Sequence, residues 1–499
     1  MNSYLFYDIE TTGLNKAFDQ ILQFAAIRTD MNFNEMERHD IMVKLRPDVI
    51  PSPKATITHR ISIAQSMQGV CEFEAIAQIH RLVNQPGTIS LGYNTSRFDD
   101  EFLRFCFHRN LLPPYTHQHK EGCRRCDLLP ITIMYYLYKG EVLDNWPEID
   151  GKRTMRLEYL SKANQLATGQ AHNAMVDVEA TVELARRLYK EQKMWHYLDG
   201  YFDKAEDTKR IEKIPISFRS IACTTRIALM IGNEYGSANH YQVPVLLIGN
   251  SIPYKNQTLW LRLDNLKLRD IQLSDIPSKT SSGEEEKGFF QKSWVIRKKY
   301  GEPCIVLPPK ERYWNSLSQE RQRIVEENKD WLQSHTTVFH KMIQYHREFR
   351  YPKIPDLDIE AALYQNGFLS EKEHALGRQF HAAPLPDKVE MVSKFVDIDM
   401  RKLASRLLCR NYPDNLPIML TKDFEDYMRR VNPENEDEAL FDHKYSKRTT
   451  PAVALMEIDK LRKESELDNQ QVELLDELEN HIKQSFPNPA AMLRQSRVP

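Results

Sequence analysis

The sequence predicts a chain of three domains: an α/β layered domain, a small β-barrel or sandwich, and an all-helical C-terminal region. Up to about residue 190, strand-like and helix-like segments alternate. From about residue 193 to 350, short β-prone runs are separated by turn signals. Beyond residue 351, apolar residues recur at helical spacing. A length of 499 residues fits about three domains.

The first domain, residues 1–192, opens with three strand-like stretches: SYLFYDIE, QILQFAAIRTD and HDIMVKL. A helical stretch, CEFEAIAQIHRLV, and a further strand, GTISLGYN, follow them. The segments DDEFLRFCFHRN and VDVEATVELARRLYKEQ then have helical character. This alternation indicates a sheet covered by helices.

The second domain, residues 193–350, contains the β-prone runs ACTTRIALMIG, QVPVLLIGN, QTLWLRLDN and SWVIRKKYGEPCIVL. The acidic stretch SKTSSGEEEKG is predicted to be flexible, and the prolines of YPKIPDLD predict a linker. The helical third domain spans residues 351–487, and residues 488–499 are predicted to be a disordered tail. Its last helices are expected to pack through a stripe of Leu455, Ile458, Leu461, Val472, Leu475, Leu478 and Ile482.

The composition is that of an ordinary globular protein, with 41% hydrophobic and 28% charged residues. A formal net charge of −2 does not indicate nucleic-acid binding, but a local basic groove can exist within a neutral total. Seven cysteines without a repeating framework predict reduced thiols. The sequence has neither a run of eighteen apolar residues nor a secretion signal, so we expect a cytoplasmic protein without membrane contact.

Two carboxylates one residue apart, Asp8 and Glu10, interrupt the first strand-like stretch. Side chains at i and i+2 of a strand share a face, so this pair points away from the side of Tyr7 and Ile9. Two like charges this close and half buried repel each other unless a cation lies between them. The pair therefore suggests a metal site, although an isolated D-x-E motif also occurs by chance.

Two further acidic motifs accompany this pair. Asp99 and Asp100 directly follow a strand at the start of a predicted helix, where Asp100 could instead cap the helix. His172 precedes Asp177 by five residues, about 500° of helix, so the two do not share a helix face. Asp177 is expected to hold a metal from the helix, while His172 reaches a water from the preceding segment. A histidine that stood alone would more often be structural.

In this order, the motifs resemble those of the DEDD exonucleases of the histidine subtype over the first 190 residues. The stretches QFAAIRTD, LGYN followed by RFDDEF, DLL, NWPE, RLEYLSKAN and AHNAMVDVEAT, with ALYQNGF and RNYPDNL later, are similar to the bacterial exodeoxyribonuclease I family. The resemblance implies an RNase H-like exonuclease domain, an SH3-like β-barrel that clamps DNA, and a helical C-terminal domain. It also implies a 3′-to-5′ exonuclease that degrades single-stranded DNA to 5′-mononucleotides in DNA repair and recombination.

The chemistry of such an enzyme explains the acidic residues. Phosphodiester hydrolysis needs charge neutralisation on the attacking and leaving oxygens, which two divalent ions about 3.5 to 4 Å apart can supply. Oxygen ligands with room for water favour Mg²⁺, or Mn²⁺ in its place, over zinc. The expected metal ligands are Asp8, Glu10, Asp99 and Asp177, and His172 is expected to accept the proton of the attacking water.

Two residues are expected to bind the substrate. Glu10 faces the point where the 3′ end must enter, so it could also hold the terminal nucleotide. Arg156 opens RLEYLSKAN and matches, by resemblance, a nucleotide-binding arginine that could grip a phosphate with two hydrogen bonds. A surface salt bridge is the other interpretation of Arg156. The resemblance further implies a monomer that docks the acidic C-terminal tail of the single-strand DNA-binding protein.

Three segments mix Lys or Arg with Tyr or Phe and are candidate DNA-binding walls, or else solvated faces: residues 298–301, 345–353 and 401–413. Two other functions remain open. An exoribonuclease of the same superfamily would use the same catalytic residues, but such enzymes are generally short single-domain chains. A non-catalytic DNA-binding scaffold would not need all five site residues, which are present.

Two local features depart from the family pattern. The segment HQHKEGCRRC contains four potential zinc ligands, His117, His119, Cys123 and Cys126. A basic DNA-facing loop with free thiols is the preferred interpretation of this segment. His59 in ITHRIS stands where relatives commonly have glycine, which bears on how the 3′ end of the strand is seated.

Overall fold

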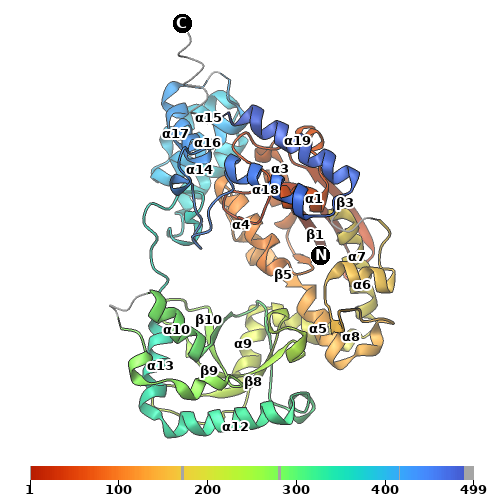
Figure 1. Ribbon diagram of the computed structural model, residues 1–499, viewed down its shortest axis with the longest axis vertical. Coiled ribbons are helices and arrows are strands. Elements are labelled where there is room, and N and C mark those ends of the chain that lie inside the picture. The colour runs from red at the N-terminus through yellow and green to blue at the C-terminus, as the bar shows by residue number, and fades with distance from the viewer. Residues whose placement is uncertain (1, 170–172, 279–282, 415, 488–499) are drawn as a thin grey trace. The chain divides into compact units, whose positions relative to one another are not determined.

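The computed structural model describes residues 2–169, 173–278, 283–414 and 416–487. The chain forms two compact units (Figure 1). The first unit comprises residues 1–125, 167–182 and 353–499, and the second comprises residues 126–166 and 183–352. The C-terminal helices therefore share a unit with the N-terminal sheet, while the domain boundaries expected near residues 192 and 350 stay predictions.

A mixed five-stranded sheet forms the centre of the N-terminal region, with strand order β3-β2-β1-β4-β5. β1 is antiparallel to β2 and parallel to β4, and β2 is antiparallel to β3. This mixed sheet confirms the predicted α/β exonuclease fold class. The strands are β1 (Ser3–Thr11), β2 (Ile21–Thr29), β3 (Glu35–Met42), β4 (Thr88–Gly92) and β5 (Arg124–Asp127).

Helices pack against one face of this sheet. Tyr7 and Ile9 of β1 belong to one hydrophobic core with Ile76 and Ile79 of α3 and with Phe102 of α4. This burial fixes which face of β1 is turned inward, so the alternate residues of the strand face the other side. The helices of this region are α1 (Pro53–His59), α2 (Ile63–Met67), α3 (Glu72–Val83), α4 (Asp99–Arg109) and α7 (Ala174–Tyr189).

The C-terminal region is helical, as predicted, and its last two helices, α18 and α19, contact α1 (Figure 1). The predicted stripe is a packing stripe, because Ile458, Leu475, Leu478 and Ile482 are buried in one core cluster. Val472 is the exception and stays 40% exposed. The helices are α14 (Glu371–Ala382), α15 (Leu385–Met391), α16 (Ile398–Asn411), α17 (Ile418–Val431), α18 (Pro451–Glu464) and α19 (Asn469–Ser485).

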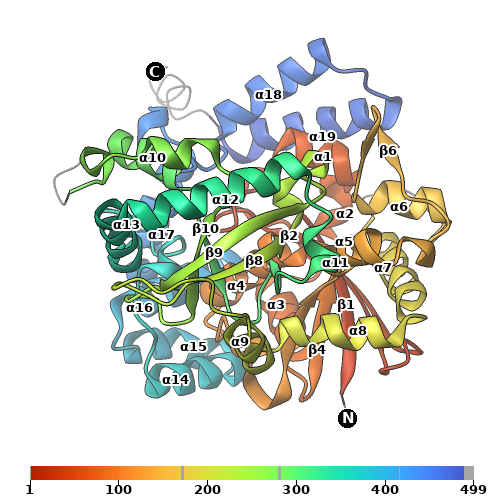
Figure 2. The same cartoon turned by 90° about the horizontal axis from the view of Figure 1, so that it is seen from below.

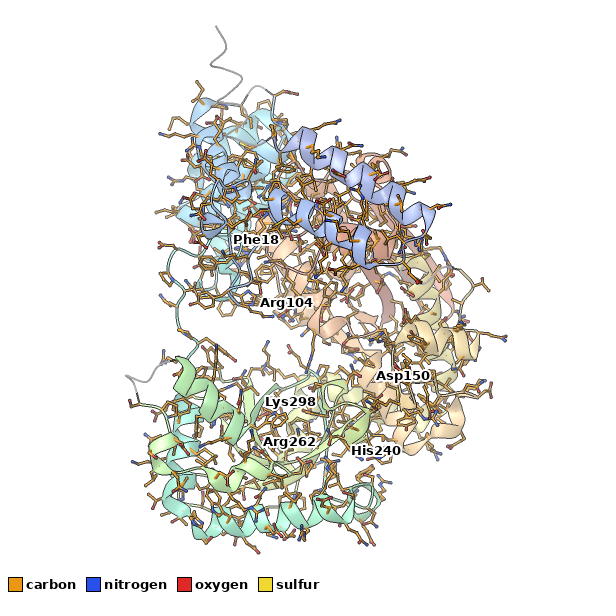
Figure 3. The ribbon with its side chains drawn as sticks, viewed as in Figure 1. Phe18, Arg104, Asp150, His240, Arg262 and Lys298 are labelled. Atoms are coloured by element: carbon orange, nitrogen blue, oxygen red, sulfur yellow. The ribbon has the colours of Figure 1, made fainter. Side chains whose placement is uncertain are left out.

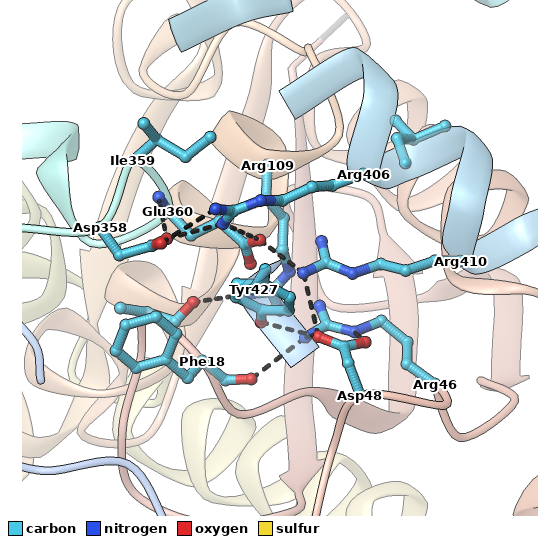
Figure 4. Close-up of polar contacts among 12 residues, drawn as sticks. Phe18, Arg46, Asp48, Arg109, Asp358, Ile359, Glu360, Arg406, Arg410 and Tyr427 are labelled. Carbon is cyan, nitrogen blue, oxygen red and sulfur yellow. Dashed lines mark hydrogen bonds and ion pairs between the residues drawn. The ribbon is translucent and has the colours of Figure 1, made fainter. Parts of the chain in front are cut away.

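Buried charged residues join the N-terminal and C-terminal parts of the first unit (Figure 4). Arg410 contacts Asp48 at 2.9 Å and Glu360 at 2.5 Å. Arg46 contacts both Asp48 and Glu72 at 3.1 Å. We call this set the acid–arginine network: Arg46, Asp48, Glu72, Arg109, Asp358, Glu360, Arg406, Arg410, Tyr427 and Arg448.

The second unit contains a curled five-stranded antiparallel sheet of order β11-β10-β9-β8-β12 (Figure 2). This sheet agrees with the predicted SH3-like barrel. Its strands are β8 (Arg226–Ile231), β9 (Gln242–Asn250), β10 (Gln257–Arg262), β11 (Val295–Lys299) and β12 (Ile305–Leu307), and a separate hairpin pairs β6 (Glu148–Ile149) with β7 (Lys152–Arg153).

Helices of the second unit cover this sheet, and Phe339, Met342 and Ile343 of α13 share a core with strand residues. The acidic stretch predicted to be flexible instead begins a helix, α10, in its described part. The helices are α5 (Leu128–Tyr138), α6 (Leu157–Asn164), α8 (Gln192–Asp199), α9 (Lys204–Glu212), α10 (Gly283–Ser293), α11 (Glu311–Trp314), α12 (Gln319–Ser334) and α13 (Thr336–Glu348).

Three further predictions can be compared with the fold. All seven cysteines are free, as expected for reduced thiols. In the part of the chain that the structure describes, no helix is both long enough and apolar enough to cross a bilayer. The proline-rich linker has no helix or strand between residues 351 and 361. The predicted disordered tail, residues 488–499, lies outside the described residues.

Candidate active site

β1 presents two carboxylates on the face opposite its buried apolar residues. Asp8 pairs with Ala25 of β2 and Glu10 pairs with Gln23, after which a bulge shifts the register. Tyr7 and Ile9 are buried in the core with residues of α3 and α4. Because side chains alternate along a strand, both carboxylates point to the opposite face of the sheet. Both are only partly buried, so ligands can reach them.

The parallel neighbour β4 leads a third carboxylate to the same region. β4 ends at Gly92, and a Cβ atom there would lie 2.7 Å from the backbone oxygen of Tyr7. Glycine therefore allows the close approach of the two chains at this point. Asn94 then adopts a left-handed conformation with φ of 65°, and α4 begins at Asp99.

The fourth carboxylate lies near the start of α7. Asn173 precedes this helix, and its side-chain oxygen accepts hydrogen bonds from the backbone amides of Met175 and Val176. This capping fixes the beginning of the helix, so Asp177 falls in its first turns. The helix dipole favours a negative charge at that end.

Asp8, Glu10 and Asp177 come together although they are far apart in the sequence. Each offers a carboxylate oxygen, and these oxygens all lie within 4.8 Å of one another. Among the described residues, this is the one group of three or more acidic, histidine or cysteine side chains with such a spacing. We call it the carboxylate cluster. Asp99 lies beside it, because its charge acts on both Asp8 and Glu10.

The proximity of these carboxylates changes their protonation. Burial, together with Asp99, Glu10 and Asp177, raises the pKa of Asp8 well above its usual range. Burial, Asp177 and Asp99 raise the pKa of Glu10 to about 9. Without a counter-charge, the cluster would thus hold protons near neutral pH. A divalent cation would replace those protons, and an all-oxygen donor set fits Mg²⁺ or Mn²⁺ better than zinc.

Two predicted site residues are not brought into this cluster by the described structure. His172 lies outside the described residues. Arg156 is exposed in the second unit, at the residue that precedes α6. Its guanidinium has no ion pair with any residue in the described ranges, so the alternative of a surface salt bridge gains no support. Its role in binding phosphate stays a prediction.

The alternative interpretation of Asp100 as a helix cap is wrong. The residue before α4 is Phe98, and no side chain caps the helix there. The Asp100 carboxylate is instead buried and accepts a hydrogen bond of 2.9 Å from the Tyr7 hydroxyl. Its second oxygen accepts a hydrogen bond from Arg125. Adjacent aspartates at the start of one helix thus have different partners.

The four potential zinc ligands of the HQHKEGCRRC segment do not form a metal site among the described residues. His117 is fully buried, and its ring lies at a steep angle to the ring of Phe107. Burial and the neighbouring Arg125 and Arg104 lower the pKa of His117 well below its usual range. Cys123 donates a hydrogen bond to the backbone oxygen of Gln85. The zinc interpretation fails because packing, rather than a shared ligand geometry, positions these side chains.

Two of the three candidate DNA-binding walls contain basic residues that are buried. In the 298–301 segment, Lys298 is buried within the second unit and contacts Asp207 at 2.6 Å (Figure 3). In the 401–413 segment, Arg406 and Arg410 belong to the acid–arginine network. Only the 345–353 segment keeps an exposed aromatic residue, Tyr351, which is 58% exposed. Sequence spacing alone could not distinguish a buried ion pair from a solvated basic face.

The structure adds basic and aromatic residues that the sequence did not single out. The Lys16 ammonium lies 5.1 Å from the centre of the Phe98 ring, directly before Asp99. On the same unit, the Arg104 guanidinium lies 5.9 Å from the centre of the Tyr115 ring (Figure 3). Tyr115 in turn contacts the edge of Phe368, which is 95% exposed. Arg104 lies five residues after Asp99, about 500° of helix, so its spacing from Asp99 gave no signal for this contact.

Comparisons with known proteins agree with this geometry. Residues 5–185 match the family described as "Exonuclease", and residues 357–485 match the family described as "Exonuclease I C-terminal domain". The chain is 29% identical to exodeoxyribonuclease I of Escherichia coli over 442 residues, which cover 86% of this chain and 90% of that protein. The chain is thus a homologue of bacterial exodeoxyribonuclease I. It is therefore an exonuclease, and exodeoxyribonuclease I of Haemophilus influenzae is 36% identical over 47% of this chain and 49% of that protein.

Solved structures of the exodeoxyribonuclease I family have the same fold. A moderately thermophilic exonuclease I from Methylocaldum szegediense aligns with a TM-score of 0.79 and 24% identity, covering 97% of this chain and 100% of that chain. E. coli exonuclease I in complex with a dA16 oligonucleotide aligns with a TM-score of 0.78, 24% identity, and coverage of 97% and 100%. This likeness supports the fold class predicted from the sequence.

Proposed function

We propose that this exonuclease removes 5′-mononucleotides from the 3′ end of single-stranded DNA in a reaction that depends on divalent metal ions. The observation that carries the proposal is the carboxylate cluster, in which three acidic side chains offer oxygens within 4.8 Å of one another. Its relatives are named exodeoxyribonuclease I, and one similar structure is a complex with dA16. Mg²⁺ is the proposed cofactor, as a pair of ions that Mn²⁺ could replace.

The residues divide the work as follows. Asp8, Glu10 and Asp177 would hold the metal together with Asp99, whose charge is felt within the cluster. Divalent ions bound there would lower the pKa of the attacking water and neutralise charge on the leaving 3′ oxygen. His172 would accept the proton of that water, a role suited to a side chain that titrates near neutral pH.

Substrate binding would use charge and stacking outside the cluster. Glu10 would contact the terminal nucleotide, and Arg156 would bind a phosphate. Lys16 over Phe98 offers a cation beside an aromatic ring next to Asp99, which is the combination that single-strand binders use.

The Tyr115 ring, next to Arg104, and the exposed ring of Phe368 offer a further stacking surface, while the Arg104 side chain itself is buried. Neither surface reads base identity, so the proposal is for binding without sequence preference.

The wider role is inferred from the family. A cytoplasmic monomer that acts in DNA repair and recombination, and that docks the C-terminal tail of the single-strand DNA-binding protein, would fit an exonuclease of this kind.

Digestion of a 5′-labelled single strand tests the proposal. We expect a descending ladder of products with Mg²⁺, no products in EDTA, and little digestion of a blunt duplex of the same sequence. A matched RNA strand should resist digestion, since the 2′-hydroxyl is its main chemical difference. Faster digestion of RNA would favour the exoribonuclease alternative, and cuts inside the strand would contradict the proposal.

A pair of variants on one helix provides the control. Asp177→Asn removes a ligand from the carboxylate cluster and should abolish the ladder. Glu179→Gln, two residues further along α7, removes a partly exposed carboxylate that pairs with Arg38 on the surface and should leave the rate unchanged. Equal loss of activity in both variants would show that α7 itself, rather than the cluster, is sensitive to substitution.

A further inference from the structure

We propose that Asp100, held between Tyr7 and Arg125, is a positioning residue that fixes Asp99 against the carboxylate cluster and thereby sets the affinity of the cluster for a divalent cation. The inference rests on the proposed function only for its effect on catalysis. Its effect on metal binding can be measured without any nuclease assay. Asp100 itself is not offered as a metal ligand.

The contacts of Asp100 occupy both of its oxygens. The Tyr7 hydroxyl donates to Oδ1 at 2.9 Å, and Arg125 of β5 donates to Oδ2. Nε2 of the buried His117 lies 4.0 Å from Oδ1. The side chain of Asp100 is 2% exposed, so it has no access to a solvent cation. Asp100 is therefore tied to two strands of the sheet.

The link joins the two elements that carry Asp8 and Asp99. Tyr7 is the residue before Asp8 on β1, and its side chain points to the opposite face of the sheet. Asp100 is the residue after Asp99 in the first turn of α4. Successive helical residues are about 100° apart, so anchoring Asp100 to one side directs Asp99 to another.

The location of this link gives it consequences beyond stability. α4 begins without a capping side chain, and the Asp100 contacts tie its first turn to β1 and β5. The carboxylate of Asp99 is the neighbouring charge that acts most strongly on Asp8. A shift of this turn would therefore alter the carboxylate cluster before it altered the hydrophobic core. Residues that orient metal ligands commonly change metal affinity by about 10- to 100-fold when they are replaced.

A matched pair of tyrosine variants tests the proposal on the full-length protein. Tyr7→Phe removes the hydroxyl that donates to Asp100, and Tyr427→Phe removes a hydroxyl that donates to Asp48 at the same distance of 2.9 Å. Both tyrosines are 2% exposed, so the loss of a buried hydrogen bond should lower the melting temperature of each variant similarly. Mn²⁺ affinity is then measured by isothermal titration calorimetry, with the metal as the only ligand.

We expect Tyr7→Phe to weaken Mn²⁺ binding by about tenfold and Tyr427→Phe to leave it unchanged. Asp100→Asn should weaken Mn²⁺ binding as well. In the double variant Tyr7→Phe/Asp100→Asn, the fold-loss of Mn²⁺ affinity should be smaller than the product of the two single fold-losses, because both substitutions break the same contact. Equal Mn²⁺ affinity in the two tyrosine variants would overturn the proposal. If Tyr7→Phe does not fold, Arg125→Lys replaces it in the same comparison.

The outcomes separate this inference from the proposed function. Weaker Mn²⁺ binding by Tyr7→Phe, in a wild type that releases no nucleotides from single-stranded DNA, would refute the proposed function and support the positioning role. Nucleotide release by the wild type, with unchanged Mn²⁺ binding by Tyr7→Phe, would refute the positioning role alone. A wild type that binds no Mn²⁺ would refute both.

Discussion

In the carboxylate cluster, Asp8 and Glu10 face further carboxylates, whereas in the acid–arginine network Asp48 and Glu360 face arginines. Both regions belong to the first unit, and in both burial opposes the charged form. In the cluster, neighbouring acids add to the effect of burial, and the pKa of Glu10 rises to about 9. In the network, Arg410 and Arg406 outweigh the effect of burial, and the pKa of Glu360 falls to about 2.

The comparison shows that burial does not determine what a buried carboxylate does. The network carboxylates already have their counter-charges, supplied by residues far along the chain, so they contribute to packing and leave nothing for a ligand to neutralise. The cluster carboxylates face one another, so they repel and gain most from an added cation. A divalent cation therefore has more to neutralise in the cluster than in the network.

The largest expected effect is on the rate of nucleotide release, which should depend on the carboxylate cluster and not on the acid–arginine network. Asp8→Asn should lower the rate of nucleotide release by about a thousandfold or more, because a metal ligand contributes several kcal/mol to the transition state. Asp48→Asn should destabilise the protein but leave the rate per folded molecule nearly unchanged. The measurement is single-strand digestion at a temperature where circular dichroism shows both variants folded. A large loss of rate in folded Asp48→Asn would contradict the view that the network contributes to stability and not to the reaction.

The next effect is on stability. Arg410→Met removes the arginine that pairs with both Asp48 and Glu360, so the free energy of unfolding should fall by about 3–5 kcal/mol. Arg429→Met provides the control, because Arg429 is 76% exposed and its pair with Asp426 should contribute at most about 1 kcal/mol. Urea denaturation measures both. A loss below about 1 kcal/mol in Arg410→Met would mean that the network does not hold the unit together.

The smallest effect concerns pH in the absence of metal. The folded pKa of Glu10, about 9, lies above its ordinary value of 4.5, so the folded protein holds a proton that the unfolded chain releases. In EDTA, stability should therefore fall as pH rises from about 5 toward 9. Glu10→Gln should make this slope shallower, with the rest due to Asp8, and should melt a few degrees above the wild type at pH 8.

The same experiment has an opposite expectation for the network. Because the folded pKa of Glu360 is lowered to about 2, its contribution is present above the ordinary value of 4.5 and is lost as pH falls toward 2. Melting temperatures across both pH ranges provide the measurement. If the stability of the wild type in EDTA rises between pH 5 and 9, the cluster carboxylates do not hold protons in the absence of metal, and the interpretation of the cluster is wrong.

The cluster was predictable from local patterns, because strand alternation alone directs Asp8 and Glu10 to one face. The distinction between Asp99 and Asp100 was not, because it depends on Tyr7 and Arg125, which contact Asp100 through the fold. The helical character of the C-terminal region followed from apolar spacing. Its packing against the N-terminal helices α1, α2 and α3 did not, since an amphipathic period reveals that a face is buried and not what covers it.

Basic residues were the hardest to interpret from the sequence. Lys298, Arg406 and Arg410 occur in segments that also suit a nucleic-acid surface, yet each is buried against a carboxylate. Their partners lie elsewhere in the chain, as Asp207 lies 91 residues before Lys298. Long-range pairing of this kind leaves no signature in a local window.

The discontinuous path of the first unit has a consequence for its synthesis. Tyr427 follows its partner Asp48 by 379 residues, and the whole of the second unit is encoded between them. As the chain leaves the ribosome, the residues of the carboxylate cluster emerge long before Arg410 and Arg448, two of the arginines that neutralise Asp48. The first unit therefore cannot complete its fold until the C-terminal helices have been synthesised. Completion of translation, rather than synthesis of the cluster residues, thus determines when the nuclease is assembled.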